Sequence, residues 1–342
     1  MRWAAINLLV FIHPILASSG DRSNDFQQCL LHCDNAICTA NSPNSLPLTL
    51  RLTGWTCTDN CKYMCMHKIT AQNIASGLAI HQYYGKWPFW RFVAQEPASV
   101  AFSLLNLFVH IRGAKKMRVA LDYSHPMKVY YMGWSFVSMN TWIWSSVFHT
   151  RDTAFTEKMD YFSAALTILV ALYFTIARLF HLYAPARPKT FLATTFEHDS
   201  QGKKALLKLW STACALTFLG HISYLTHLER FDYSYNVTFN LVVGLVHNAL
   251  WLCYSLPSSV SFLRRFPNRS KRYRPHFVYK PALLVSLIIA AMALELLDFP
   301  PWALIFDAHS LWHLSTAPIA YLWYQFLIED AGHDSWKEQR LS

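Results

Sequence analysis

Apolar segments about as long as a membrane span recur along the chain from residue 97 onward, separated by shorter polar stretches. A helix needs about 20 predominantly apolar residues to cross a bilayer. The pattern predicts seven such helices, at 97–112, 127–149, 160–182, 204–226, 235–256, 280–298 and 303–326. We therefore expect an all-α membrane protein, with a seven-helix transmembrane domain over 97–328 and a tail over 329–342.

The first residues of the chain predict entry into the secretory pathway. Arg2 precedes an apolar stretch that ends at Leu16, and Ala17 and Ser19 fit the small-residue rule for cleavage of a signal peptide. The sequence thus predicts a signal peptide over 1–19. An uncleaved anchor helix is the alternative, although the apolar run is short for a membrane span.

Cysteines gather in the segment that follows, over residues 20–96. Six of the eight cysteines lie there, at Cys29, Cys33, Cys38, Cys57, Cys61 and Cys65. An even number of cysteines just after a signal peptide indicates a disulfide-rich lumenal segment with three bridges. Fifteen pairings are possible, and the sequence does not choose among them. The spacings are not those of zinc fingers, and Cys214 and Cys253 are predicted to be core thiols.

Composition and charge agree with a membrane protein. Only 15% of the residues are charged, against about 25% in soluble domains. The net charge of +10 is concentrated in three inter-helix loops and the helix ends beside them, which together hold seventeen lysines and arginines, while the loops on the other side hold three. Positive loops stay in the cytosol, so the N-terminus is predicted to be lumenal and the tail cytosolic. The placement of charge argues against binding of nucleic acid.

With this topology, polar side chains of three helices meet at the lumenal face. Ser145 and His149 lie four residues apart near the end of the second helix, Asp160 begins the third, and His309 and His313 lie in the first turns of the seventh. Residues four apart share one face of a helix. Ionisable groups inside a bilayer are unfavourable and usually serve function.

Three histidines with an open position are typical of a catalytic zinc site, in which the metal lowers the pKa of a water molecule to about 7. Asp160 is the predicted proton-transfer group, with Glu157 as an equal candidate, and Ser145 is the predicted partner of the water or the oxyanion. Ser145 could instead bond to its own helix. The histidines could also form a proton relay or a packed polar pair.

These residues, in this order, resemble the membrane hydrolase superfamily of alkaline ceramidases and adiponectin-receptor-like proteins. The stretches "WSSVFHTRD", "TEKMDYFSA", "DAHSLWHLST" and "GWTCTDNCKYMCM" resemble one branch of it, the family of post-GPI-attachment-to-proteins factor three. The resemblance implies that His149, His309 and His313 bind Zn²⁺ and that Asp160 and Ser145 interact with its water.

The resemblance also implies remodelling of GPI anchors. Such a protein would act as a phospholipase A2-type hydrolase that removes the unsaturated sn-2 acyl chain of the GPI phosphatidylinositol and leaves a lyso-GPI. Its partners would be GPI-anchored proteins, as substrates, and membrane lipid, in the Golgi membrane or alternatively that of the endoplasmic reticulum. The residues alone do not separate an ester from an amide substrate, and Asn236 is the one lumenal sequon for a glycan.

Two other functions are compatible with the residues. A non-enzymatic receptor or chaperone-like factor would use the Cys-rich segment to bind its partner and the histidines as structure. A proton-coupled transporter would place ionisable groups near mid-membrane, whereas these groups are predicted to lie at the lumenal end.

Overall fold

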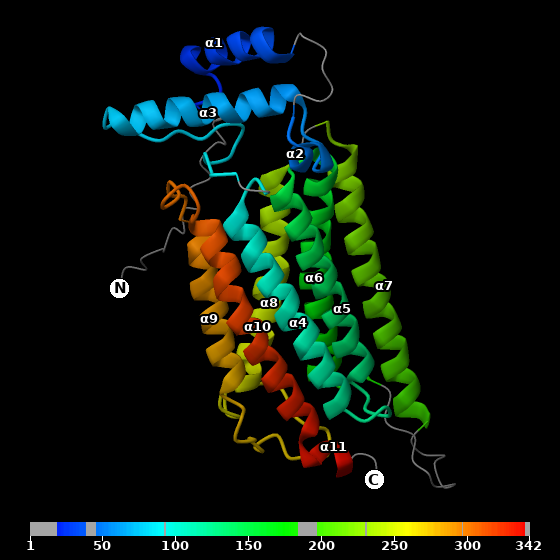
Figure 1. Ribbon diagram of the computed structural model, residues 1–342. Helices are drawn as coiled ribbons and strands as arrows, with labels where there is room; N and C mark the ends of the chain where they lie inside the picture. The colour runs from blue at the N-terminus through cyan, green and yellow to red at the C-terminus, as the bar shows by residue number, and fades with distance from the viewer. Residues whose placement is uncertain are drawn as a thin grey trace, which may run out of the picture. The chain divides into compact units, whose positions relative to one another are not determined.

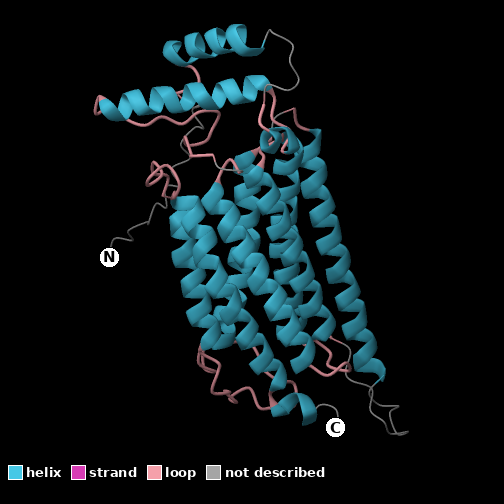
Figure 2. Ribbon diagram, viewed as in Figure 1, coloured by secondary structure: helices cyan, strands magenta, loops and turns pink. Residues whose placement is uncertain are grey.

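The computed structural model describes residues 19–38, 46–91, 94–183, 197–229, 231–295 and 297–338, without the side chains of 197–200 and 295. The predicted signal peptide lies outside these residues, apart from its last position. Throughout the described ranges the regular structure is helical, and the only pairings of strand type are two isolated bridges (Figure 2). The chain forms two compact units, Met1–Val93 with Phe299–Asp307, and Ala94–Asp298 with Ala308–Ser342.

The first unit is held together by three disulfides. Its helices are α1 (Asn24–Cys33), the π-helical turn η1 (Asp34–Cys38), α2 (Leu48–Leu52) and α3 (Cys57–Ala75). The pairs are Cys29–Cys65, Cys33–Cys61 and Cys38–Cys57. Because each pair lies about one turn from the next, the bridges join α1 and η1 antiparallel to α3. The prediction of three disulfides is confirmed, and bonded sulfurs are not available as thiolate ligands for a metal.

A capping box fixes where α3 begins. The Thr56 hydroxyl accepts a hydrogen bond from the backbone N–H of Asp59, and the Asp59 carboxylate accepts one from the backbone N–H of Thr56. Such caps satisfy helix N–H groups that have no partner within the helix. The cap sets the start of the helix at Cys57, so that the three cysteines of α3 face those of α1 and η1.

The described residues of the second unit form seven long helices. They are α4 (Pro97–Ala120), α5 (Lys128–Thr150), α6 (Ala154–Leu179), α7 (Glu197–His227), α8 (Tyr233–Ser255), α9 (Lys280–Glu295) and α10 (Ala308–Gly332), and the short α11 (Asp334–Glu338) follows. Each of the seven apolar segments coincides with one of them. Contacts between neighbours close a ring in the order α4, α5, α6, α8, α9 and α10, while α7 packs on α6 outside that ring (Figure 1).

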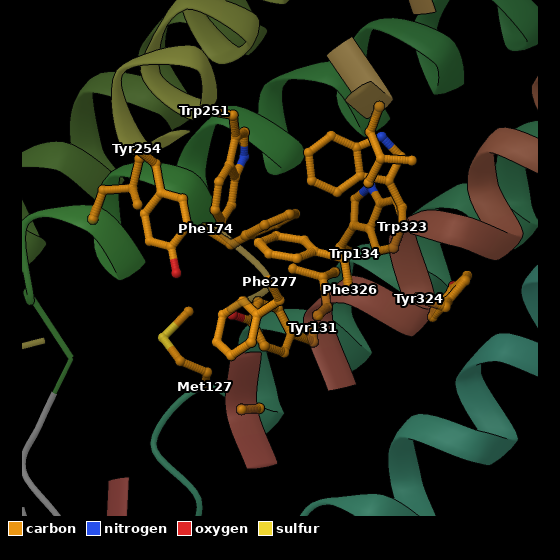
Figure 3. Packing of buried hydrophobic residues seen from close by; sticks show 14 of the residues in the cluster. Met127, Tyr131, Trp134, Phe174, Trp251, Tyr254, Phe277, Trp323, Tyr324 and Phe326 are labelled. Carbon is orange, nitrogen blue, oxygen red and sulfur yellow. The ribbon is translucent and has the colours of Figure 1, made fainter. Parts of the chain in front are cut away.

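Aromatic side chains fill the middle of this ring. Trp134 of α5, Phe174 of α6, Trp251 of α8 and Trp323 of α10 all belong to one buried cluster (Figure 3). Their rings pack mostly edge to face, as between Trp251 and Phe326, which is the favoured geometry for aromatic pairs. The cluster holds the helices in register and so fixes the relative positions of their ends.

The last long helix differs from its predicted bounds at both ends. It begins at Ala308 rather than at 303, because prolines precede it and Ala303 and Leu304 adopt left-handed φ angles of 54° and 56°. It continues to Gly332 rather than ending at 326, because Asp330 is fully buried against Arg178. The sequence placed Asp330 in the tail, since a charged residue is normally solvated.

Three of these helices, Ala154–Leu179, Gln201–His227 and Tyr233–Ser255, are long and apolar enough to cross a membrane. They make the chain a membrane protein, and the count of seven spans remains a prediction. The ring helices α4, α5 and α10 are as long, but they carry buried serine, asparagine and histidine side chains that lower their hydropathy. Among the described helices, α5, which bears His149, buries the largest number of polar side chains.

Candidate metal centre

The three predicted histidines meet at one end of the second unit. His149 lies in the last turn of α5, and His309 and His313 lie in the first two turns of α10. The Nε2 atoms of His149 and His309 are 3.4 Å apart, and those of His309 and His313 are 2.9 Å apart. His149 and His313 are each only 2% exposed, and His309 is half-buried. Two helices that are far apart in the sequence, α5 and α10, thus bring three histidine side chains together at one buried point.

The cluster fits a metal ion. Tetrahedral zinc, with Zn–N bonds of about 2.0–2.1 Å, separates its nitrogen ligands by about 3.3 Å. The His149–His309 spacing matches that value, and the shorter His309–His313 spacing would widen slightly. One ligand atom from each of the three side chains lies within 4.8 Å of the others. Three imidazoles on two helices therefore form a donor set suited to zinc.

Glu96, which the sequence did not single out, is the hydrogen-bond partner of His149 on the side of the ring away from the other histidines. Its carboxylate Oε2 lies 2.8 Å from His149 Nδ1, and its backbone N–H donates to the His149 carbonyl oxygen at 3.0 Å. Glu96 is only 6% exposed. Its position directly before Pro97 made it look like a lumenal loop residue, and the available signal was an acidic residue at the start of an otherwise apolar helix.

Ser145 belongs to a chain of hydrogen bonds that reaches His313. Its hydroxyl lies 2.9 Å from that of Ser103 on α4, which in turn lies 3.1 Å from His313 Nδ1. The neighbouring Ser146 bonds back to its own helix, at the Trp142 carbonyl. The Ser145 hydroxyl thus bonds to Ser103 of another helix and not to a carbonyl oxygen of its own helix. Ser145 contacts the site through Ser103.

Asn106, one turn further along α4, also contacts the second histidine helix. Its Nδ2 donates to the carbonyl oxygen of His313 at 2.7 Å. The Thr316 hydroxyl donates to that same carbonyl and to Asn106 Oδ1. These side chains therefore join α4 to α10 at the turn that bears His313.

Asp160 is not a member of the three-histidine group. It lies two turns into α6, its side chain is half-buried, and its carbonyl oxygen accepts a hydrogen bond from Ser163 at 2.9 Å. Glu157, the alternative proton-transfer residue, bonds to the hydroxyl of Tyr233 on α8. The structure therefore brings the three histidines and Ser145 together with Glu96 and Ser103, while Asp160 lies on the adjacent helix.

The sequence profile of the Per1-like family matches residues 47–331, which is most of the chain. The chain belongs to the Per1-like family. The match runs from the Cys-rich segment to the end of α10, so it includes every residue of the histidine site. This match and the relatives described next confirm the resemblance to the family of post-GPI-attachment-to-proteins factor three.

Three relatives are similar to this Per1-like protein over nearly their whole length. A zebrafish (Danio rerio) protein named GPI-specific phospholipase A2-like PGAP3 is 38% identical over 94% of this chain and 92% of its own. The human (Homo sapiens) protein of that name is 38% identical over 92% of this chain and 89% of its own. A fission yeast (Schizosaccharomyces pombe) PER1 homolog is 38% identical over 95% of this chain and 91% of its own.

Asn236 does not suit glycosylation. Its side chain is only 2% exposed, within the first turn of α8, where it lies 3.4 Å from Asn240. A glycan at this nitrogen would have to displace the packing of α8. The sequence left glycosylation of Asn236 open, and the burial of the residue argues against it.

Proposed function

We propose that this Per1-like protein is a zinc-dependent lipid acyl hydrolase that remodels GPI anchors, acting on the sn-2 acyl ester of the GPI phosphatidylinositol. The observation that carries the proposal is the convergence of His149, His309 and His313 at one buried point. The names of the PGAP3 relatives, which specify a GPI phospholipase A2-like protein, supply the substrate class. GPI-anchored proteins are the proposed substrates.

The three histidines would hold the metal through their Nε2 atoms, which face one another. A bound zinc ion supplies Lewis-acid activation of water and of the ester carbonyl. In the hydrolysis, the water oxygen would bond to the carbonyl carbon while the bond between that carbon and the glycerol oxygen breaks, and one proton would pass from the water to the leaving glycerol oxygen. Asp160 is the proposed carrier of that proton. The products are a free fatty acid and a lyso-GPI.

Ser145 is the proposed hydrogen-bond donor to the developing oxyanion. If His313 Nδ1–H donates to the Ser103 hydroxyl, then Ser103 can donate to Ser145, and the O–H of Ser145 is directed onward as a donor. Removing one such donor typically lowers the rate about 100-fold to 1000-fold. Ser145→Ala should therefore leave residual activity, whereas loss of a histidine ligand should abolish it.

The proposed location is the Golgi membrane, with the endoplasmic reticulum as the alternative, and with the histidine end of the bundle facing the lumen. The predicted signal peptide and the positive loops support this orientation. The disulfides of the first unit support an oxidising compartment for the segment that precedes α4 in the sequence. In this orientation the site would face the lumenal leaflet.

The test combines metal content with a lipid assay on the detergent-purified full chain. Wild type should contain about one zinc per chain and release fatty acid from a GPI lipid labelled at sn-2, but not from a ceramide. The double variant His309→Ala, His313→Ala should lose both. His276→Ala is the matched control, because His276 is an exposed histidine that pairs with Glu329. Folded wild type without metal would refute the zinc mechanism, and release from ceramide alone would refute the substrate.

A receptor or chaperone-like role makes the opposite prediction. In that case the double histidine variant would bind GPI-anchored proteins less well, yet no unremodelled GPI lipid would accumulate in cells that carry it. Lipid analysis of GPI-anchored proteins from such cells, beside cells with His276→Ala, separates the two functions.

A further inference from the structure

A buried polar stripe runs along α4 and is not explained by the predicted catalytic residues. Its members follow at spacings of three and four residues, so they share one face of the helix. They are Glu96, Ser99, Ser103, Asn106 and His110, none more than 6% exposed. This face meets α5 on one side and α10 on the other, the two helices that bear the histidines (Figure 1). Burial of so many polar groups requires hydrogen-bond partners.

The first member determines which nitrogen of His149 is left for a metal. A carboxylate oxygen accepts hydrogen bonds, so in the 2.8 Å contact with Glu96 the proton lies on His149 Nδ1. The Nε2 lone pair is then available, and it points toward His309. The separate backbone bond from Glu96 N to the His149 carbonyl keeps residue 96 in place whatever its side chain.

Ser103 is the hydrogen-bond partner of His313 Nδ1, as Glu96 is of His149 Nδ1. Its hydroxyl lies 3.1 Å from His313 Nδ1 and 2.9 Å from the hydroxyl of Ser145. A hydroxyl can accept one hydrogen bond while it donates another. Ser103 can therefore accept from Nδ1–H and still donate to Ser145, which again leaves Nε2 without a proton. Two buried histidines thus receive their outer partners from a single helix.

We propose that Glu96 and Ser103 are positioning residues, which hold His149 and His313 in the ring orientation and tautomer that present Nε2 to the metal. The inference rests on the proposed metal site and extends it to α4. Ligand histidines generally donate their second ring N–H to a carboxylate or another acceptor, and loss of that acceptor weakens metal binding about 10-fold to 100-fold. Neither residue touches the reacting atoms.

The test measures zinc affinity of the full chain in detergent, by competition with a chelator, for Glu96→Ala, Glu96→Gln and Ser103→Ala. Glu96→Ala should bind zinc about 10-fold to 100-fold more weakly than wild type. Glu96→Gln should lose less, because the amide oxygen still accepts from Nδ1–H and the side chain keeps its shape. Ser103→Ala should weaken binding, and the visible spectrum of the cobalt(II) form should change in both alanine variants.

Ser99→Ala is the matched control for Ser103→Ala. Ser99 lies four residues earlier on the same buried face of α4, and it takes part in none of the hydrogen bonds described here between α4 and the histidines. The same hydroxyl is removed from the same helix, so a general loosening of α4 would affect both variants. Zinc affinity should fall for Ser103→Ala and stay at the wild-type value for Ser99→Ala.

A second measurement separates positioning from plain stability. For each variant, the melting temperature is recorded with and without zinc. A positioning role predicts that the rise in melting temperature on adding zinc becomes smaller in Glu96→Gln and Glu96→Ala. An unchanged rise, with wild-type zinc affinity, would overturn the inference while leaving the metal site intact. Absence of zinc binding in wild type itself would instead overturn the proposed function.

Discussion

At the end of the bundle away from the histidines, Arg178 of α6 and Asp330 of α10 form an ion pair whose side chains are both fully buried. Arg178 Nε and Nη2 each donate to a different oxygen of the carboxylate, both at 2.7 Å. Tyr254 donates to the same carboxylate, and Arg178 Nη1 donates to the Arg265 carbonyl at 2.8 Å. The pair is therefore hydrogen-bonded on all sides and shielded from water.

Asp330→Asn removes the negative charge while keeping the size of the side chain. The guanidinium of Arg178 is then left buried without a counter-ion, and breaking a buried pair in this way typically lowers stability by about 3–5 kcal/mol. That is a large share of the roughly 5–15 kcal/mol that stabilises a folded protein. We expect Asp330→Asn to unfold at markedly lower denaturant concentration, measured by circular dichroism during unfolding in mixed detergent micelles.

Two comparisons make this prediction refutable. Asp334→Asn is the control, because Asp334 is four residues away with a side chain that is 78% exposed, and its change should stay within about 0.5 kcal/mol. The apolar pair Arg178→Met, Asp330→Leu should be less destabilising than Asp330→Asn alone, since no unpaired charge remains. A loss below about 1 kcal/mol for Asp330→Asn, or an equally unstable apolar pair, would contradict the reasoning.

Three further predictions concern packing, disulfides and pH. Gly113→Ala would place a Cβ 2.3 Å from the ring of Tyr324, so it should lower the free energy of unfolding by about 1–3 kcal/mol, measured in the same micelle assay. Removing the bridge Cys38–Cys57, which closes 19 residues, should lower the stability of the first unit by about 3 kcal/mol, measured by its protease sensitivity. Burial lowers the pKa of His67 below its usual value, so the unfolded state binds the proton more readily, and protease resistance of the first unit should fall as pH drops below about 6.5.

The apolar pattern predicted where the helices lie better than where they end. Each predicted segment coincides with a helix, because burial of apolar surface decides the existence of an element. The ends depend on contacts that the pattern does not encode. Asp330 extends α10 only because Arg178, far away in the sequence, is buried opposite it. Likewise, the spacing of the cysteines does not determine which of them pair. The pairing is determined by the antiparallel packing of α1 on α3.

The candidate site could be predicted in part, for a related reason. His309 and His313 share a helix face by spacing alone, and the ring of helices brings His149 to them. Glu96 and Ser103 carry no local signal of this kind, because their histidine partners are more than 50 residues away in the sequence. A serine within an apolar helix is unremarkable until the helix is placed between two others.

The site depends most on α4, a helix whose apolar sequence is interrupted by buried polar residues. Apolar side chains at positions 96 and 103 would bury the Nδ1–H groups of His149 and His313 without acceptors, which is unfavourable for each by about 1–3 kcal/mol. These polar groups at the start of α4 thus match its position between the two histidine helices. Since the same polar groups leave both Nε2 atoms facing His309, the features that weaken α4 as a membrane span are those that make the three histidines suitable for a metal.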